Sequence, residues 1–182
     1  GGLYTYAHGI SCSAACTVTI TGNVTGGSGG TYAYGIYCTA ACTVTITGNV
    51  TGGSGGYAFG IYFTAACTVT ITGNVTGGIS YGAHGISCTA ACTVTITGNV
   101  TGGSGVYALG INCTAACTVT ITGNVTGGSG DSAWGIYCTA ANNIITISGT
   151  ILGKTAVGVY LTNYTTGSSL TVTGVIGDGT GV

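Results

Sequence analysis

Residues Ala41–Gly53, with the sequence ACTVTITGNVTGG, decide the fold because they recur almost unchanged along the chain. The other copies begin at Ala15, Ala66, Ala91 and Ala116, which gives a period of 25 or 26 residues. A unit of this size cannot bury its own apolar face, so neighbouring copies must stack to form a core. We therefore expect one structural unit that is repeated along an axis.

Each repeat reads as three short strands separated by bends. Within 43–47, β-branched residues alternate between polar and apolar, which predicts a strand with threonines outward and apolar side chains inward. Gly48 and Asn49 tolerate positive φ and supply a bend. Val50–Thr51 forms a second short strand, and a third begins at Tyr57. Such a unit is one rung of a β-solenoid.

The sequence predicts an all-β parallel β-helix of about seven rungs, each of ~25 residues with three short strands. A Gly-Ile or Gly-Val step marks the rungs, at Gly9, Gly35, Gly60, Gly85, Gly110, Gly135 and Gly158. We expect a single domain over 1–182, with regular rungs in 1–141 and divergent rungs in 142–182. The divergence begins at Asn142-Asn143, where one residue is inserted.

The rung from Tyr34 to Asn49 resembles bacterial and archaeal surface proteins with right-handed parallel β-helix repeats, which are related in fold to pectate lyases. The resemblance implies an extracellular or cell-surface protein. It also implies a column of stacked asparagines at one bend, and the matching residues are Asn23, Asn49, Asn74, Asn99 and Asn124. Thr150 departs from that column.

Charge is almost absent from the chain, at 2% of residues with a net charge of −1. A soluble domain usually has about 25% charged residues, so this surface has little charge to keep copies apart. We expect no nucleic-acid partner, because a basic footprint is missing. We also expect no membrane insertion, because no apolar run approaches the roughly 18 residues that a spanning helix needs.

Chemistry-bearing residues are too few to predict an enzyme or a cofactor. Pectate-lyase-like enzymes imply clustered acids and a basic residue, whereas this chain has one lysine, no arginine and two separated aspartates. His8 and His84 share a sequence position that bulky residues occupy in other rungs, which favours packing roles. A metal site would need ligands that converge from two places in the chain, and we expect none.

Ten cysteines form two columns, and two interpretations stay open. Disulfides within rungs would pair 12–16, 38–42, 88–92 and 113–117, leaving Cys67 and Cys138 unpaired. The spacing C-T-A-A-C on a straight strand puts the Cα atoms about 13 Å apart, beyond the ~7 Å limit for a disulfide, so bridges require a bend. The alternative is two columns of buried thiols. Phe63 interrupts the first column and Asn142 the second. The residues of the predicted bridges are Cys12, Cys16, Cys38, Cys42, Cys88, Cys92, Cys113 and Cys117.

The asparagine column also matches the glycosylation pattern Asn-x-Thr, as do Asn112 and Asn163 outside it. Rungs stack about 4.8 Å apart, which would crowd a glycan on every rung. Covalent glycans therefore fit the two residues outside the column more easily.

The function that we expect is an extracellular structural protein that stacks end to end into a filament, fibre or sheath. Its partners are copies of itself, because solenoids expose strand edges at both ends and neither end offers a polar cap. The expected head-to-tail interface has Tyr4, Tyr6 and Ile10 on one side and Leu170, Val172, Ile176 and Val182 on the other.

Two alternative functions remain. The threonine face resembles the flat arrays of β-helical insect antifreeze proteins, which implies ice binding. The residues of that face are Thr43, Thr45, Thr47, Thr68, Thr70, Thr72, Thr93, Thr95 and Thr97. The chain also fits the stalk of a larger surface adhesin.

Overall fold

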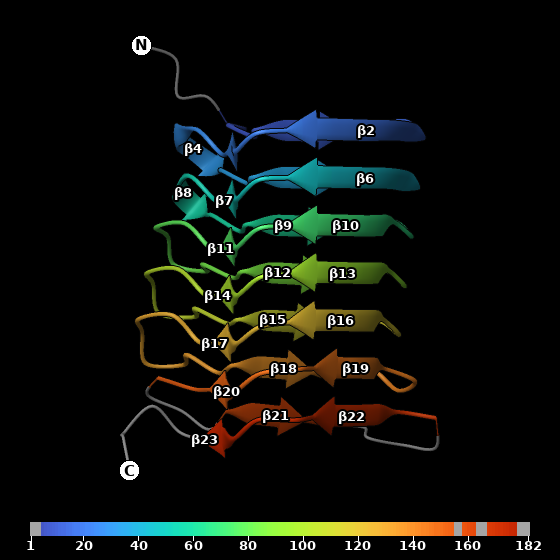
Figure 1. The fold of residues 1–182 in the computed structure, drawn as a ribbon. Helices are drawn as coiled ribbons and strands as arrows, with labels where there is room; N and C mark the ends of the chain where they lie inside the picture. The colour runs from blue at the N-terminus through green and yellow to red at the C-terminus, as the bar shows by residue number, and fades with distance from the viewer. Residues whose placement is uncertain (1–4, 155–157, 163–166, 178–182) are drawn as a thin grey trace.

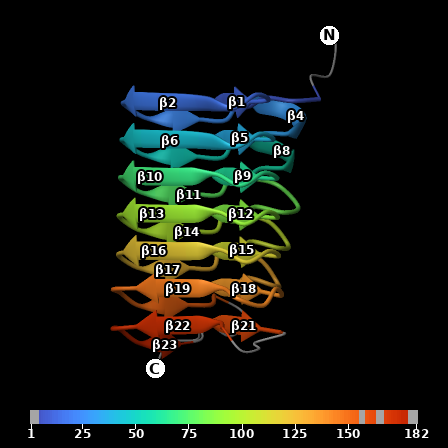
Figure 2. The ribbon, with the colours of Figure 1, turned by 90° about the vertical axis from the view of Figure 1, so that its right-hand side faces the viewer.

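The computed structural model describes residues 5–154, 158–162 and 167–177, and in this part of the chain it confirms the predicted β-solenoid. Successive rungs lie on top of one another along a single axis, with the first rung at one end and the last at the other (Figure 1). A view from the side shows the same strands in parallel rows (Figure 2). No helix among the described residues is long and apolar enough to span a membrane.

Among the described residues, three parallel sheets form the walls, and each contains seven strands. The first sheet contains β1 (Ile10–Cys12), β5 (Ile36–Cys38), β9 (Ile61–Phe63), β12 (Ile86–Cys88), β15 (Ile111–Cys113), β18 (Ile136–Cys138) and β21 (Val159–Leu161). The second contains β2 (Cys16–Thr21), β6 (Cys42–Thr47), β10 (Thr68–Thr72), β13 (Thr93–Thr97), β16 (Thr118–Thr122), β19 (Ile144–Ile147) and β22 (Ser169–Val172). The third contains β3 (Val24–Thr25), β7 (Val50–Thr51), β11 (Val75–Thr76), β14 (Val100–Thr101), β17 (Val125–Thr126), β20 (Ile151–Leu152) and β23 (Ile176–Gly177).

A short fourth sheet pairs β4 (Ser28–Tyr32) with β8 (Ser54–Tyr57) beside the first two rungs. The register of this pair shifts between Ser28 and Gly30, so Gly29 has no partner in β8. In later rungs the same region makes only isolated bridges.

The register of the three sheets places equivalent residues of successive rungs beside each other. Val44 pairs with Val69, and Val69 pairs with Val94. The core is therefore built from columns, several of which repeat one residue type over successive rungs. Val44, Ile46 and Val50 are at most 1% exposed, whereas the threonines between them point outward.

The third predicted strand is wrong at its start. Tyr57 ends β8, residues 58–60 form a bend, and the strand of the first sheet begins at Ile61. Ala58, Phe59 and Gly60, which connect the two strands, are all buried.

The insertion in the sixth rung is a local backbone feature at Asn142. Its φ of 59° lies in the left-handed region, which asparagine adopts more readily than most residues. Asn143, and not Asn142, takes the place of the second cysteine column, because Ile144 is in register with Thr118. Asn143 is buried, and its Oδ1 accepts a hydrogen bond from the Cys117 amide at 2.9 Å.

Aromatic rings stack along the corner that precedes the first sheet. His8 lies on Tyr34 at a centroid distance of 4.9 Å, Tyr34 on Phe59 at 5.0 Å, and Phe59 on His84 at 4.5 Å. The histidines thus occupy packing positions, as their shared position in the repeat predicts. Nδ1 of His84 accepts a hydrogen bond from the Leu109 amide at 3.3 Å, and burial lowers the pKa of His84 to about 4.

Glycine is required at the bend after the second sheet because two backbones approach closely there. Gly98 has a φ of +148°, and a Cβ on it would overlap the carbonyl oxygen of Gly73 in the preceding rung. Gly22 has a φ of +134°, but no atom lies within 4 Å of a Cβ built on it. Gly22 differs because it belongs to the first described rung.

We predict that Gly98→Ala destabilises the fold much more than Gly22→Ala does. The left-handed backbone costs an alanine about 1–2 kcal/mol at either position, whereas the overlap at Gly98 adds a clash with backbone, for a total of about 4 kcal/mol or more. Urea unfolding of the dilute proteins measures both changes. Equal losses for the two variants would contradict the close approach.

We also predict that acid destabilises the fold through His84. A pKa lower in the folded than in the unfolded protein means that the stabilisation is complete above about pH 6.5 and is lost as the pH falls toward 4. The loss is about 3 kcal/mol. Unfolding free energies measured between pH 7 and 4 should lose most of this dependence in His84→Leu, since leucine already stands at position 109. His8→Leu, a change at a less buried ring, is the control and should retain the dependence.

Candidate functional site

The two cysteine columns lie on either side of the corner between the first and second sheets. Cys12 and Cys38 end strands of the first sheet, and Cys16 and Cys42 begin strands of the second. Register pairs Cys12 with Cys38 and Cys16 with Cys42. All of the cysteines face the apolar core, where nine are buried and Cys16 is half-buried.

All ten cysteines are free thiols in the structure. None of the four predicted bridges is therefore present, and the arrangement is that of the alternative interpretation, two columns of buried thiols. Cys67 and Cys138, which the bridge scheme left unpaired, are buried thiols like the others. Bridges between residues 12–16, 38–42, 88–92 and 113–117 stay a prediction for an oxidised form of the protein.

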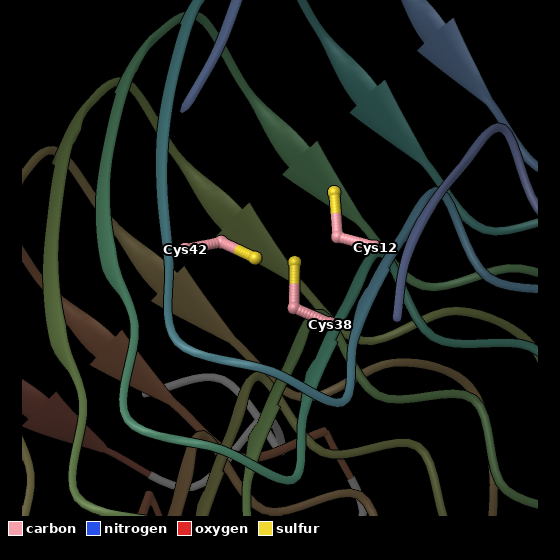
Figure 3. A group of neighbouring side chains, drawn as sticks. All are labelled: Cys12, Cys38 and Cys42. Carbon is pink, nitrogen blue, oxygen red and sulfur yellow. The ribbon is translucent and has the colours of Figure 1, made fainter. Parts of the chain in front are cut away.

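Three thiols converge in the first two rungs. The Sγ atoms of Cys12, Cys38 and Cys42 all lie within 4.8 Å of one another, and Figure 3 shows that Cys42 points toward the other two from the opposite side of the corner. We call these three residues the thiol triad. A metal site needs ligands from two places in the chain. The spacing within one rung does not bring them together, but the contact between successive rungs does.

Cys16 adjoins the triad from the edge of the solenoid. Its Sγ lies 3.3 Å from Sγ of Cys42, and hydrogen bonds with Cys12 and Cys42 raise the pKa of Cys16 to about 12. Burial raises the pKa of Cys38. Burial also acts to raise the pKa of Cys42, but hydrogen bonds from the surrounding thiols outweigh it and lower that pKa.

Phe63 closes the first column below the triad. It is fully buried and in register with Cys38 on one side and Cys88 on the other. Cys67 continues the second column, where its Sγ donates to the carbonyl oxygen of Ala40 at 3.4 Å. The thiols of the first two rungs are therefore separated in the first column from those of the later rungs.

The asparagine column forms a ladder of hydrogen bonds along the axis. Oδ1 of each asparagine accepts from the backbone amide one rung further on, at 2.8–2.9 Å, beginning with Asn23 and ending with Asn124, which accepts from Thr150. These asparagines are exposed, and glycosylation of Asn23, Asn49, Asn74, Asn99 and Asn124 stays a prediction. Outside the ladder, Asn112 is half-buried and donates to Ser87 at 3.3 Å. Asn163 lies outside the described residues.

The threonine array lies on the outer face of the second sheet. Its rows are in register, because Thr45 pairs with Thr70 and Thr70 with Thr95. All nine predicted residues point outward, and all are exposed except Thr95, which is half-buried.

The predicted end-to-end residues lie on the first and last rungs. Tyr6 is 61% exposed and Ile176 50% exposed, while Ile10, Leu170 and Val172 are half-buried. Tyr4 and Val182 lie outside the described residues.

One feature that sequence reasoning missed is a long groove beside the third sheet. It is lined by residues of the Thr-Gly-Gly segments of five successive rungs, beginning with Thr25 and Gly26, and by Leu152 and Gly153 of the next rung. The sequence signal that could have predicted the groove was the repetition of Thr-Gly-Gly. Stacking of the rungs places these glycines, which have no side chains, in one row. Lys154 also lines the groove.

Comparison with known proteins gives one family. The model of the family described as "Periplasmic copper-binding protein (NosD)" matches residues 3–172. No curated protein and no solved structure matches the chain. The family is periplasmic, which is compatible with the predicted extracellular or cell-surface location, and it consists of parallel β-helices of the pectate-lyase-like kind. Since the match covers nearly the whole chain and the structure has that fold, the chain belongs to the NosD family of periplasmic copper-binding proteins.

Proposed function

We propose that this surface or periplasmic β-helix is a structural protein whose copies stack end to end into a filament. The observation that carries the proposal is the open core at both described ends of the solenoid. The role is mechanical and not catalytic, which the near absence of charged side chains supports. Copies of the chain are the proposed partners.

Apolar side chains that are buried in interior rungs are uncovered in the end rungs. Val44 and Ile46 are at most 1% exposed, but Val18 and Ile20, at the same positions of the first rung, are half-buried. Val172 is likewise half-buried in the last rung. Covering these side chains would bury further apolar surface, at roughly 25 cal/mol per Å².

The two ends match each other in pattern. Residues 169–172 of β22 alternate between polar and apolar in the same phase as residues 17–20 of β2, since both strands belong to the same sheet. If β22 of one copy pairs with β2 of the next, Leu170 lies beside Val18 and Val172 beside Ile20. Such a head-to-tail contact does not close, and it generates a filament. The edge strands supply main-chain hydrogen bonds.

We predict that Gly22→Ala abolishes filaments while the single molecule stays folded. In every interior rung the equivalent glycine meets the carbonyl oxygen of the preceding rung, as Gly48 meets that of Gly22. Stacking would place the carbonyl of Gly174 of one copy against Gly22 of the next, where an alanine Cβ has no room. Electron microscopy and sedimentation of both proteins measure filament length.

Gly29→Ala is the matched control. Gly29 also has a positive φ with no atom within 4 Å of an added Cβ, but it has no partner residue in the next rung. Its variant should form filaments like the parent protein. Rods of one fixed length from the parent chain would rule out the filament and favour a stalk segment of a larger adhesin. Filaments from Gly22→Ala would rule out stacking in this register.

A second candidate function is ice binding, which the in-register threonine array favours. Spacings of about 6.7 Å along a strand and 4.8 Å between rungs make a flat lattice of hydroxyl and methyl groups. We expect thermal hysteresis from the parent chain and a strong reduction in Thr70→Tyr, whose ring would protrude from the array. Thr64→Tyr, at an exposed position outside the array, is the control. Freezing behaviour equal to that of an inert protein would exclude this function.

The description of the family also names copper binding, and we propose that this chain can take up copper at its thiols. Soft thiolates are the ligands that select Cu(I). The thiol triad is a group of three such donors with sulfur atoms close enough to share one ion. The filament proposal does not depend on copper bound at the thiol triad.

A further inference from the structure

We infer that Cys12, Cys38 and Cys42 form a binding site for one Cu(I) ion. The three Sγ atoms lie within 4.8 Å of one another, and Cys42 lies on the opposite side of the corner from Cys12 and Cys38 (Figure 3). The inference deepens the copper binding that is proposed above, and it is independent of filament formation.

The spacing of the sulfur atoms suits a three-coordinate ion. A metal about 2.3 Å from each of three coplanar sulfurs places those sulfurs about 4 Å apart, which falls inside the 4.8 Å limit of the triad. Small adjustments of side-chain torsions are sufficient to reach this geometry. The backbone needs no rearrangement, because register already holds Cys12 beside Cys38.

The donor set favours Cu(I) over zinc. Structural zinc sites use four ligands in a tetrahedron, whereas this group contains three, and Cys16 does not join it although it contacts Cys42. In the described part of the chain no histidine or carboxylate belongs to the group. An all-sulfur set of low coordination number is the environment that soft, monovalent copper prefers.

The location of the triad gives an ion a way in. Cys12 is 8% exposed and Cys16 half-exposed at the open end of the solenoid, whereas Cys88 and Cys113 in later rungs are fully buried. Phe63 blocks the first column immediately below Cys38. An ion at the triad is therefore separated by Phe63 from the cysteines that follow in that column.

Binding involves no change of oxidation state. Each Cu–S bond at a thiolate forms as an S–H bond breaks, and the proton passes to solvent. Two thiolates with Cu(I) leave a net charge of −1, and the third sulfur completes the coordination as a neutral donor. Copper is supplied as Cu(I).

The test is titration of the reduced full-length chain with Cu(I) under anaerobic conditions, in competition with a coloured Cu(I) chelator. We expect one tightly bound ion per chain. X-ray absorption at the copper edge should show a first shell of three sulfurs at about 2.3 Å. Cys12→Ala and Cys38→Ala should each weaken binding at least about 100-fold, since even the loss of a group behind a ligand costs 10- to 100-fold.

Cys67→Ala is the matched control, because Cys67 is another buried thiol next to Cys42 in the second column but outside the triad. It should bind Cu(I) like the parent chain. Circular dichroism verifies the fold of each variant, and Cys12→Ala, in the end rung, keeps the test valid if Cys38→Ala does not fold. Unchanged affinity in folded Cys12→Ala, equal weakening in Cys67→Ala, or a copper shell containing nitrogen or oxygen would each overturn the inference. If Gly22→Ala still formed filaments, the filament proposal would fail but the inference of a Cu(I) site would not be affected.

Discussion

The structure depends on parallel pairing in register, which places equivalent residues of successive rungs beside one another. Val44, Val69 and Val94 form one such column. A column of apolar residues is favourable, and so is a column of asparagines that accept hydrogen bonds in turn. A column of charged residues would instead bring like charges together at the strand spacing of about 4.8 Å. In a chain of nearly identical rungs, the near absence of charge avoids this repulsion.

The same pairing explains why sites arise between rungs. Cys12 and Cys38 are 26 positions apart in sequence, yet they are direct neighbours in the first sheet. The corner then turns Cys42 toward both of them. A group of three donors thus needs only two rungs and one bend. The open ends follow from the same principle, since each rung uses its neighbours to cover its core and the described end rungs have a neighbour on one side only.

Much of the fold could be predicted from the chain, because period and alternation are local signals. The strand at 43–47, the bend at Gly48 and the inward valines all follow from residue types. The start of the strand at Ile61 could not be predicted, because it depends on how Ala58 and Phe59 pack inside the corner. The assignment of Asn142 to the second cysteine column was wrong for a related reason. Which of the two asparagines is the inserted residue follows only from the pairing of the next strand with the preceding rung. The thiol triad needed side-chain directions across two rungs, which spacing within one rung does not contain.

Near-identical rungs also create a difficulty for folding. A strand such as Thr68–Thr72 has the same sequence as its neighbours, so it could pair with the wrong rung at little local cost. Residues that occur once in their columns make such a slip expensive. If the pairing slipped by one rung, Phe63 would leave a void at its own position and would be too large for the position of a cysteine. Asn143 would lose the hydrogen bond that its side chain accepts from the Cys117 amide. The irregular rungs thus fix the register, so that a repetitive chain pairs its strands in a single order.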